Sequence, residues 1–314
     1  MEWADGFKDL VAKLSEHMAS GEKASPNVGS HCKDCEFRAD KKAYGPNAKS
    51  GFEECWSEAK KLKTADFERE FVFDIWDYRG SEDAIASNKI FAADLSDDDI
   101  EVKDRDDNKP GLSRTERQLK QIQFSRQGNK GMYINAEVLA QELDLLKGPY
   151  HFIDFETTMV AIPFHAGRKP YEQMAFQFSH HVVDQNGKCE HRTEYLETRR
   201  GHHPNYDFVR ALKKALEGDN GTVFRFAAHE NTVLNQIHQQ LGQSQEGDRD
   251  ELMAWIETLT TPPRGHENPW KPKRSFVDMR ELTLRHYYLP ETKGSNSIKS
   301  FCPPFKSSGQ GVGY

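Results

Sequence analysis

The segment Tyr150-His151-Phe152-Ile153-Asp154-Phe155-Glu156-Thr157-Thr158 anchors the fold prediction for this chain. It follows Gly148-Pro149 and is rich in aromatic and β-branched residues, which is typical of a buried β-strand. Along a strand, side chains at i and i+2 face the same way, so Asp154 and Glu156 lie on one face and Phe155 lies on the other. The pattern therefore predicts a strand that presents two carboxylates together on one face.

Five further elements are expected after this strand. Asn186-Gly187 favours a hairpin, because an Asn-Gly pair readily adopts the backbone of a tight turn. Apolar residues at helical spacing predict two amphipathic helices. The expected strands are Met174 to Val183, Cys189 to Leu196 and Thr222 to Ala228, and the helices contain Phe208, Leu212 and Leu216 and then Val233, Leu234, Ile237 and Leu241. This order of elements is that of the RNase H-like fold, in which the fourth strand lies parallel beside the first. The expected class is α/β, with a mixed sheet flanked by helices.

Three carboxylates form the candidate catalytic and metal-binding site. Asp154 and Glu156 share one strand face, and Glu230 follows the strand that ends at Ala228 and opens the next helix. Ligands gather at such strand ends. Neighbouring carboxylates repel one another unless a divalent cation neutralises them, and Mg²⁺ or Mn²⁺ is the natural partner. Spacing alone leaves an alternative open, in which Asp154 and Glu156 face water and Glu230 is an ordinary first-turn acid favoured by the helix dipole.

The motif Asp154-Phe155-Glu156-Thr157-Thr158 resembles the first motif of DnaQ-like exonucleases, whose pattern is Asp-x-Glu-Thr followed by Thr or Ser. Over residues 148–300 the chain is similar to the domain of unknown function 2779 family, which is regarded as DnaQ-like. The similarity includes Phe152 to Thr157, Ala161-Ile162-Pro163, Pro170-Tyr171-Glu172, Phe176 to His180, Glu230, Val277-Asp278 and Gly294 to Lys299. The resemblance implies that Asp154, Glu156 and Glu230 are catalytic and hold the metal, whereas Asp278 is structural. Glu230 departs from the broader superfamily, where Asp is common at this place.

The resemblance ends after Ser300. Phe301-Cys302-Pro303-Pro304 and the Ser- and Gly-rich residues that follow have the pattern of neither strand nor helix. The third motif, which would carry a fourth acid and the general base, is missing from the sequence. We therefore expect residues 301–314 to be an aberrant or disordered tail, the chain to be truncated, and the metal site to be incomplete.

The cysteines near the start of the chain form a second constellation. Cys32 and Cys35 make a CxxC pair, and Cys55 follows. The pattern resembles the cysteine cluster at the end of RecB-like nuclease domains, and this implies a 4Fe-4S cluster; zinc is the other metal considered. The fourth ligand is open, and His31, Cys189 and Cys302 are the alternatives within the chain. Reduced surface thiols in the remnant of a lost domain are an equally weighted interpretation.

The chain is expected to divide into four parts: residues 1–93 are the cysteine-containing, RecB-like segment, 94–147 are a linker and helices, 148–300 are the DnaQ-like domain, and 301–314 are the tail. Residues 94–113 are acidic and lead to Lys109-Pro110-Gly111, which predicts an exposed loop. This loop lacks the alternating ligands and the closing Glu of a calcium-binding loop.

Composition excludes several other classes of protein. The formal net charge is −7, so no overall basic field supports nucleic-acid binding, and that prediction depends on the site alone. The sequence has no apolar run of about 20 residues and no signal peptide at its start. An odd number of cysteines, five, argues against a disulfide scaffold. We expect a cytoplasmic location without membrane contact.

The leading functional hypothesis is metal-dependent hydrolysis of phosphodiester bonds in DNA or RNA, of the 3′–5′ exonuclease type, with reduced or lost activity in this truncated chain. Thr157, Thr158, Gln177 and His180 are the expected substrate-binding residues. The alternative is a non-catalytic module that binds nucleic acid or protein. Phe176 and Phe178 could stack on bases, although strand aromatics more often belong to the core.

Overall fold

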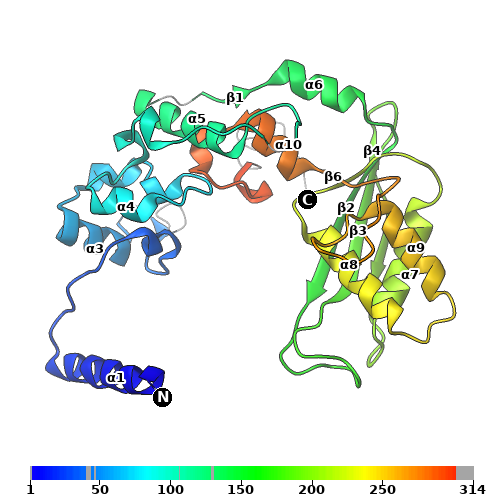
Figure 1. Ribbon diagram of the computed structural model, residues 1–314, viewed down its shortest axis with the longest axis horizontal. Helices are drawn as coiled ribbons and strands as arrows, with labels where there is room; N and C mark the ends of the chain where they lie inside the picture. Colours follow the sequence, from blue (N-terminus) through cyan, green and yellow to red (C-terminus); the bar gives the residue numbers. More distant parts are fainter. Residues whose placement is uncertain (1, 40–43, 46, 106, 129–130, 302–314) are drawn as a thin grey trace. The chain divides into compact units, whose positions relative to one another are not determined.

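The computed structural model describes residues 2–39, 44–45, 47–105, 107–128 and 131–301 (Figure 1). They form two compact units. The helical unit comprises residues 1–104, 114–131 and 293–295, and the sheet unit comprises residues 105–113, 132–292 and 296–314. The segment 94–147, expected to be one connecting region, is thus divided between the two units. Cys302 and the rest of the predicted tail after Phe301 lie outside the described residues.

The helical unit is built from short elements. Its α-helices are α1 (Glu2–Ser20), α3 (Gly51–Lys60), α4 (Ser81–Ala86) and α5 (Arg114–Gln127), and its 3₁₀ helices are η1 (Ser30–Asp34), η2 (Thr64–Glu68), η3 (Val72–Asp74), η4 (Ala92–Asp94) and η5 (Asp97–Asp99). Aromatic rings fill its core: Phe71 lies 5.2 Å from Trp56 and 5.2 Å from Phe91, measured between ring centroids. These contacts between buried rings give the unit an aromatic core.

Aspartates close the 3₁₀ helices of this unit. The third residue of each of four turns accepts a hydrogen bond from the backbone N–H of the residue before the turn. The pairs are Asp66 with Lys63 at 2.8 Å, Asp74 with Phe71 at 3.0 Å, Asp94 with Phe91 at 2.9 Å and Asp99 with Ser96 at 2.7 Å. Leu95 and Ile100 are buried between these turns. The prediction that residues 94–113 form an exposed loop is therefore wrong for the first part of that segment, because its acids cap turns and its apolar residues pack.

The sheet unit is an α/β structure with a mixed five-stranded sheet. The sheet has the order β4-β3-β2-β5-β6, and β1 and β7 form a separate pair. The strands are β1 (Tyr133–Ile134), β2 (Tyr150–Thr158), β3 (Met174–Val183), β4 (Cys189–Leu196), β5 (Val223–Arg225), β6 (Val277–Asp278) and β7 (Tyr287–Tyr288). The helices are α6 (Ala136–Asp144), α7 (Asn205–Leu216), α8 (His229–Gly242), α9 (Arg249–Leu259), α10 (Met279–His286) and the 3₁₀ helix η6 (Pro290–Thr292).

The strand order and pairing agree with the sequence prediction, but the strand expected from Thr222 to Ala228 is shorter, because β5 ends at Arg225 and Ala227 has a left-handed φ of 71°. β3 and β4 have the predicted bounds, they are antiparallel, and the Asp184 N–H donates to the Lys188 carbonyl at 3.0 Å across the predicted hairpin. β5 lies parallel beside β2, with His151 opposite Val223 and Phe152 opposite Phe224. β6 is in turn parallel to β5. The carboxyl ends of β2, β5 and β6 therefore lie along the same edge of the sheet.

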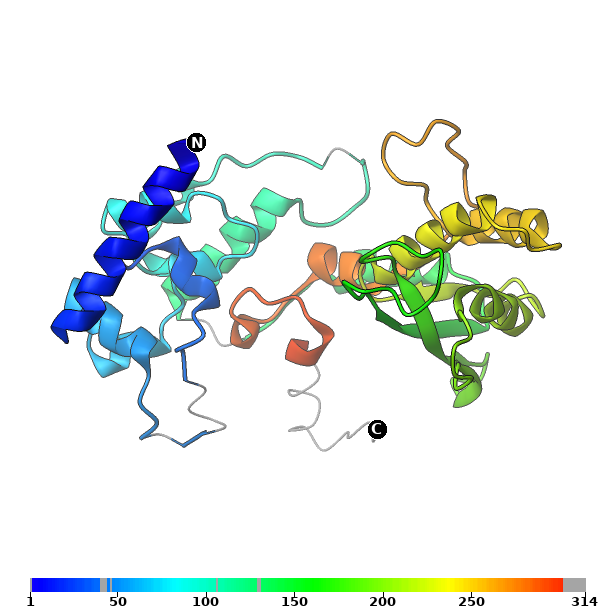
Figure 2. The same ribbon diagram turned by 90° about the horizontal axis from the view of Figure 1, so that it is seen from below.

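One face of this sheet is covered by helices. Phe155 and Phe178, opposite one another on β2 and β3, both pack edge-on against Phe208 of α7, at 4.8 and 5.4 Å between ring centroids. The same core includes Val233 of α8 and Ile256 of α9. Figures 1 and 2 show α8 and α9 side by side next to the sheet. Phe178 is therefore a core residue and is not available to stack on a base, whereas Phe176 is half-buried.

Among the described residues, no helix is both long enough and apolar enough to cross a lipid bilayer.

Candidate functional site

Asp154 and Glu156 lie on the sheet face opposite the helix-covered core. Both side chains are exposed, while Phe155 between them is 4 % exposed. β5 ends at Arg225, which its register places level with Ile153, so Asp154 lies just beyond the end of that strand. The alternation of burial along β2 is the one expected for a strand with one packed face. Both carboxylates are thus open to solvent at the edge where the parallel strands end.

Glu230 is the buried member of the acidic site. It lies in the first turn of α8, its side chain is 3 % exposed, and its Oε2 atom is buried without a hydrogen-bond partner among the described residues. Burial raises the pKa of Glu230 to about 7, and the negative charges of Asp154 and Asp278 raise it further, whereas Arg225 opposes them. The structure thus brings Glu230 into the electrostatic range of Asp154, as the sequence predicted for this pair.

Asp278 has a structural position at the end of β6. Its Oδ1 accepts hydrogen bonds from the backbone N–H groups of Arg280 at 2.9 Å and Glu281 at 3.3 Å, which caps α10. It also accepts from the Ala227 N–H at 3.0 Å, and Ala227 has a left-handed φ of 71°. Arg225, at 3.4 Å from Oδ2, completes this set of contacts. They agree with the expected structural role, and they fix the turn that leads to Glu230. Sequence reasoning missed Arg225, because a single basic residue in an apolar strand carries no motif.

The expected substrate-binding residues separate into two groups. Thr157 and Thr158 are half-buried at the end of β2, and the Thr157 hydroxyl lies 3.3 Å from Nε2 of His229, the residue before Glu230. Gln177 is opposite Glu156 in the β2–β3 register, so its side chain shares the acidic face. Of these residues, Gln177 is the one that the register places on the face of Asp154 and Glu156, whereas Thr157 is opposite the buried Ala175.

His180 lies elsewhere, and its predicted contact with substrate does not fit the structure. It is opposite Ile153 on the core-facing side of the sheet, with no exposed surface. Its Nε2 lies 2.9 Å from Nδ1 of His151, and its Nδ1 lies 2.8 Å from the Thr193 hydroxyl. His151 reaches Asp219 at 2.8 Å. Burial lowers the pKa of His180 to about 4. The physical reason for the correction is strand alternation, because His180 and Gln177 differ by an odd number of positions.

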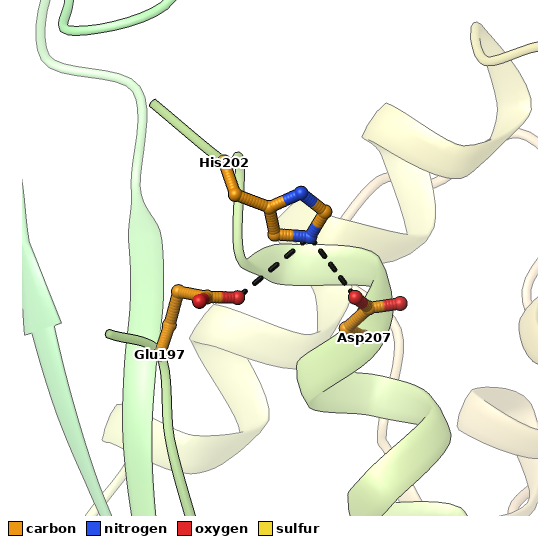
Figure 3. A group of neighbouring side chains, drawn as sticks. All are labelled: Glu197, His202 and Asp207. Atoms are coloured by element: carbon orange, nitrogen blue, oxygen red, sulfur yellow. Dashed lines mark hydrogen bonds and ion pairs between the residues drawn. The ribbon is translucent and has the colours of Figure 1, made fainter. Parts of the chain in front are cut away.

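A different group of ligand-type side chains is the most compact one among the described residues. Among the described residues, one group of three ligand-type side chains has its ligand atoms all within 4.8 Å of one another, and it consists of Glu197, His202 and Asp207 (Figure 3). His202 Nε2 lies 2.9 Å from Asp207 and 3.7 Å from Glu197. The ligand atoms of Asp154, Glu156 and Glu230 are not all within this limit of one another.

The group of Glu197, His202 and Asp207 is already neutralised by arginines. Arg199 donates to Glu197 and to Asp207, both at 2.6 Å, and Arg210 donates to Asp207 at 2.8 Å. Hydrogen bonds from Arg199 lower the pKa of Glu197 and that of Asp207 to about 2. A cation would have to displace Arg199 to reach both carboxylates. We therefore interpret this group as an ion-pair network.

The three front cysteines lie close to the core of the helical unit. Cys32 is buried in η1, and Cys35 and Cys55 are half-buried. Their sulfur atoms are not all within 4.8 Å of one another, whereas two thiolates on one tetrahedral zinc are about 3.8 Å apart. His31, one proposed fourth ligand, lies 3.0 Å from the Asn27 carbonyl, and Cys189 is an exposed residue of the sheet unit. Zinc and an iron–sulfur cluster at these cysteines both stay predictions.

Comparison with known proteins gives one match. Residues 151–297 match the model of a family described as Domain of unknown function (DUF2779). This segment of the chain is similar to DUF2779. The DUF2779 match begins at the second residue of β2 and includes every acid of the candidate site. It carries no description of activity. No curated protein and no solved structure matches the chain.

Proposed function

We propose that the DUF2779 segment hydrolyses phosphodiester bonds in DNA or RNA, with Mg²⁺ or Mn²⁺ held by Asp154, Glu156 and Glu230. One observation carries the proposal: the buried Glu230 carboxylate has an oxygen without a partner and lies in the field of Asp154. A buried carboxylate oxygen is costly to leave unpaired. A hard divalent cation, which prefers oxygen ligands, would satisfy it and would remove the repulsion between the acids.

The topology supports an RNase H-like arrangement, which is part of this proposal. β2 is the central strand, β3 and β4 extend it antiparallel on one side, and β5 and β6 extend it parallel on the other. The acids lie where the parallel strands end. This is where α/β sheets commonly bind ligands.

The exposed acids and the buried acid would have different roles in binding the metal and the substrate. Exposed Asp154 and Glu156 can face both a cation and a phosphate, while buried Glu230 provides a ligand whose position is fixed by α8. When bound, such metal ions lower the pKa of an attacking water and stabilise the leaving oxygen. Thr157 and Gln177, beside the acids, would position the substrate strand. The Arg225–Asp278 contact holds the turn before Glu230 and so fixes the ligand set.

The experiment is cleavage of end-labelled single strands of DNA and of RNA in Mn²⁺ and in EDTA. We expect Mn²⁺-dependent shortening of at least one strand by the wild-type chain, at the reduced rate that the sequence predicts, and a further loss of about a hundredfold in Asp154→Asn. Asp250→Asn is the matched control, because Asp250 is a carboxylate with 87 % exposure far along the chain on α9. Cleavage that is equal in Asp154→Asn and the wild type would contradict the proposal. Strand binding without cleavage in any metal would favour the non-catalytic module.

A further inference from the structure

An apolar pocket adjoins the acidic site on the same side of the sheet. Its volume is about 700 Å³, and side chains of α6, β2, β5 and α10 line it, all from the sheet unit. Tyr150 and Phe152 of β2 contribute rings to it, as do Phe224, Phe226 and Tyr287. Pockets of this size commonly bind small molecules or parts of larger ligands.

The register of β2 relates this pocket to the acids. Tyr150, Phe152, Asp154 and Glu156 alternate with the core-facing residues, so they share one face of the strand. Phe152 is two positions before Asp154, which corresponds to about 7 Å along the strand. Phe152 also stacks on Phe224, with ring centroids 4.9 Å apart and an angle of 7° between the rings. The pocket therefore begins immediately beside the carboxylates.

The lining, which mixes aliphatic side chains with aromatic rings, favours an uncharged and apolar ligand group. No lysine or arginine is among the residues that line the pocket, and Asp144 is its one carboxylate. A phosphate would meet no positive charge in the pocket. An aromatic base would leave water and stack on the rings that line the pocket. A nucleotide strand combines both requirements, since its bases are planar and its phosphates need the cation at Asp154.

We propose that this pocket binds an unpaired nucleobase of the strand whose phosphodiester lies at Asp154. The assignment rests on the proposed function, and it adds a base-binding subsite made of Phe152, Phe224 and Phe226. A helix of a protein partner would also suit an apolar groove, but its apolar face would gain nothing from the adjacent carboxylates. The position beside the acids therefore favours a nucleotide.

The test uses the full chain in Ca²⁺, with fluorescent single-stranded oligonucleotides in which one nucleotide at a time lacks its base. We expect wild-type affinity to fall about tenfold at one position of the abasic site. This comparison needs no variant. Equal affinity at every position would overturn the proposal.

Two variants then locate the effect. In Phe152→Leu the tenfold difference between base and abasic strand should shrink to about twofold or less, because leucine fills space but cannot stack. Asp250→Asn, a change at an 87 % exposed side chain of α9 outside the pocket, should retain it. If Phe152→Leu leaves the difference between base and abasic strand unchanged, the pocket does not bind the base and the proposal is wrong.

The outcomes separate this inference from the proposed function. Mn²⁺-dependent cleavage together with base-independent binding would overturn the pocket assignment alone. Base-dependent binding that Phe152→Leu removes, without cleavage in any metal, would overturn the proposed hydrolysis and retain a base-binding pocket.

Discussion

The two faces of strand β2 differ in whether their polar side chains are buried and paired or exposed. On the core-facing side, His151, Ile153 and Phe155 are buried, and the one polar chain among them is paired through His180 and Asp219. On the other side, Asp154 and Glu156 are exposed, and nearby Glu230 has an unpaired buried oxygen. Polar side chains on a strand therefore do not by themselves identify a functional site. The candidate site is distinguished by the exposed Asp154 and Glu156 together with the unpaired Oε2 atom of Glu230 on α8.

The largest expected effect is a change on the core-facing side. Phe155→Ala should lower the free energy of unfolding by about 3–5 kcal/mol, because it removes a buried ring that packs against Phe208. Asp154→Ala, one position away on the other face, should change it by about 0.5 kcal/mol or less. Urea denaturation of the two variants would measure both. Equal losses would show that the two faces are not distinct.

The buried histidine pair should make stability depend on pH. The pKa of His180 is about 4 in the folded chain, below its ordinary value of 6.5, so folding opposes its protonation. The associated stability is present above pH 6.5 and is lost as the pH falls from 6.5 to 4, by about 3 kcal/mol at most. His180→Gln should flatten this part of the profile of unfolding free energy against pH. An unchanged slope would mean that His180 is not the titrating group.

The acidic face should show the reverse dependence. The pKa of Glu230 is raised from 4.5 to about 7, so without a cation its contribution to stability is lost as the pH rises through this window. In EDTA at pH 8, Glu230→Gln should therefore be about 1–2 kcal/mol more stable than the wild type. Thermal denaturation at pH 5 and pH 8 would compare them. A variant that is less stable at pH 8 would show that the buried carboxylate is satisfied without metal.

The smallest effect concerns the ion-pair network of Glu197, His202 and Asp207. Arg199 is 57 % exposed, so Arg199→Met should change the free energy of unfolding less than any variant above. Zinc titration by calorimetry would check the assignment. Binding by the wild type would show that the network opens for a metal, whereas no binding is expected.

Much of the sheet could be predicted, because its signals are local. Aromatic and β-branched residues predict β2 and β3, and the Asn186-Gly187 turn predicts the hairpin that joins β3 to the mostly polar β4. The parallel position of β5 followed from the order of elements. Asp154, Glu156 and Glu230 could be identified from the sequence as candidate ligands. The motif with the first two lies at the end of one predicted strand, and Glu230 follows the end of another.

Other features depend on contacts distant in sequence. His180 was expected to touch substrate because of its proximity to Gln177, but its partner His151 is 29 positions away. The acidic composition of residues 94–99 predicts a solvent-exposed loop. In the structure Asp94 and Asp99 cap turns, and the neighbouring Leu95 and Ile100 are buried. The pocket beside Asp154 draws on strands and helices from residue 139 to residue 301, so no segment alone indicates it.

The most direct measurement of the central claim is Mn²⁺ binding, followed by electron paramagnetic resonance of the free ion. The account predicts saturable binding by the wild type and by Asp250→Asn, and binding at least tenfold weaker in Asp154→Asn and in Glu230→Gln. Equal Mn²⁺ affinity in all four proteins would contradict it.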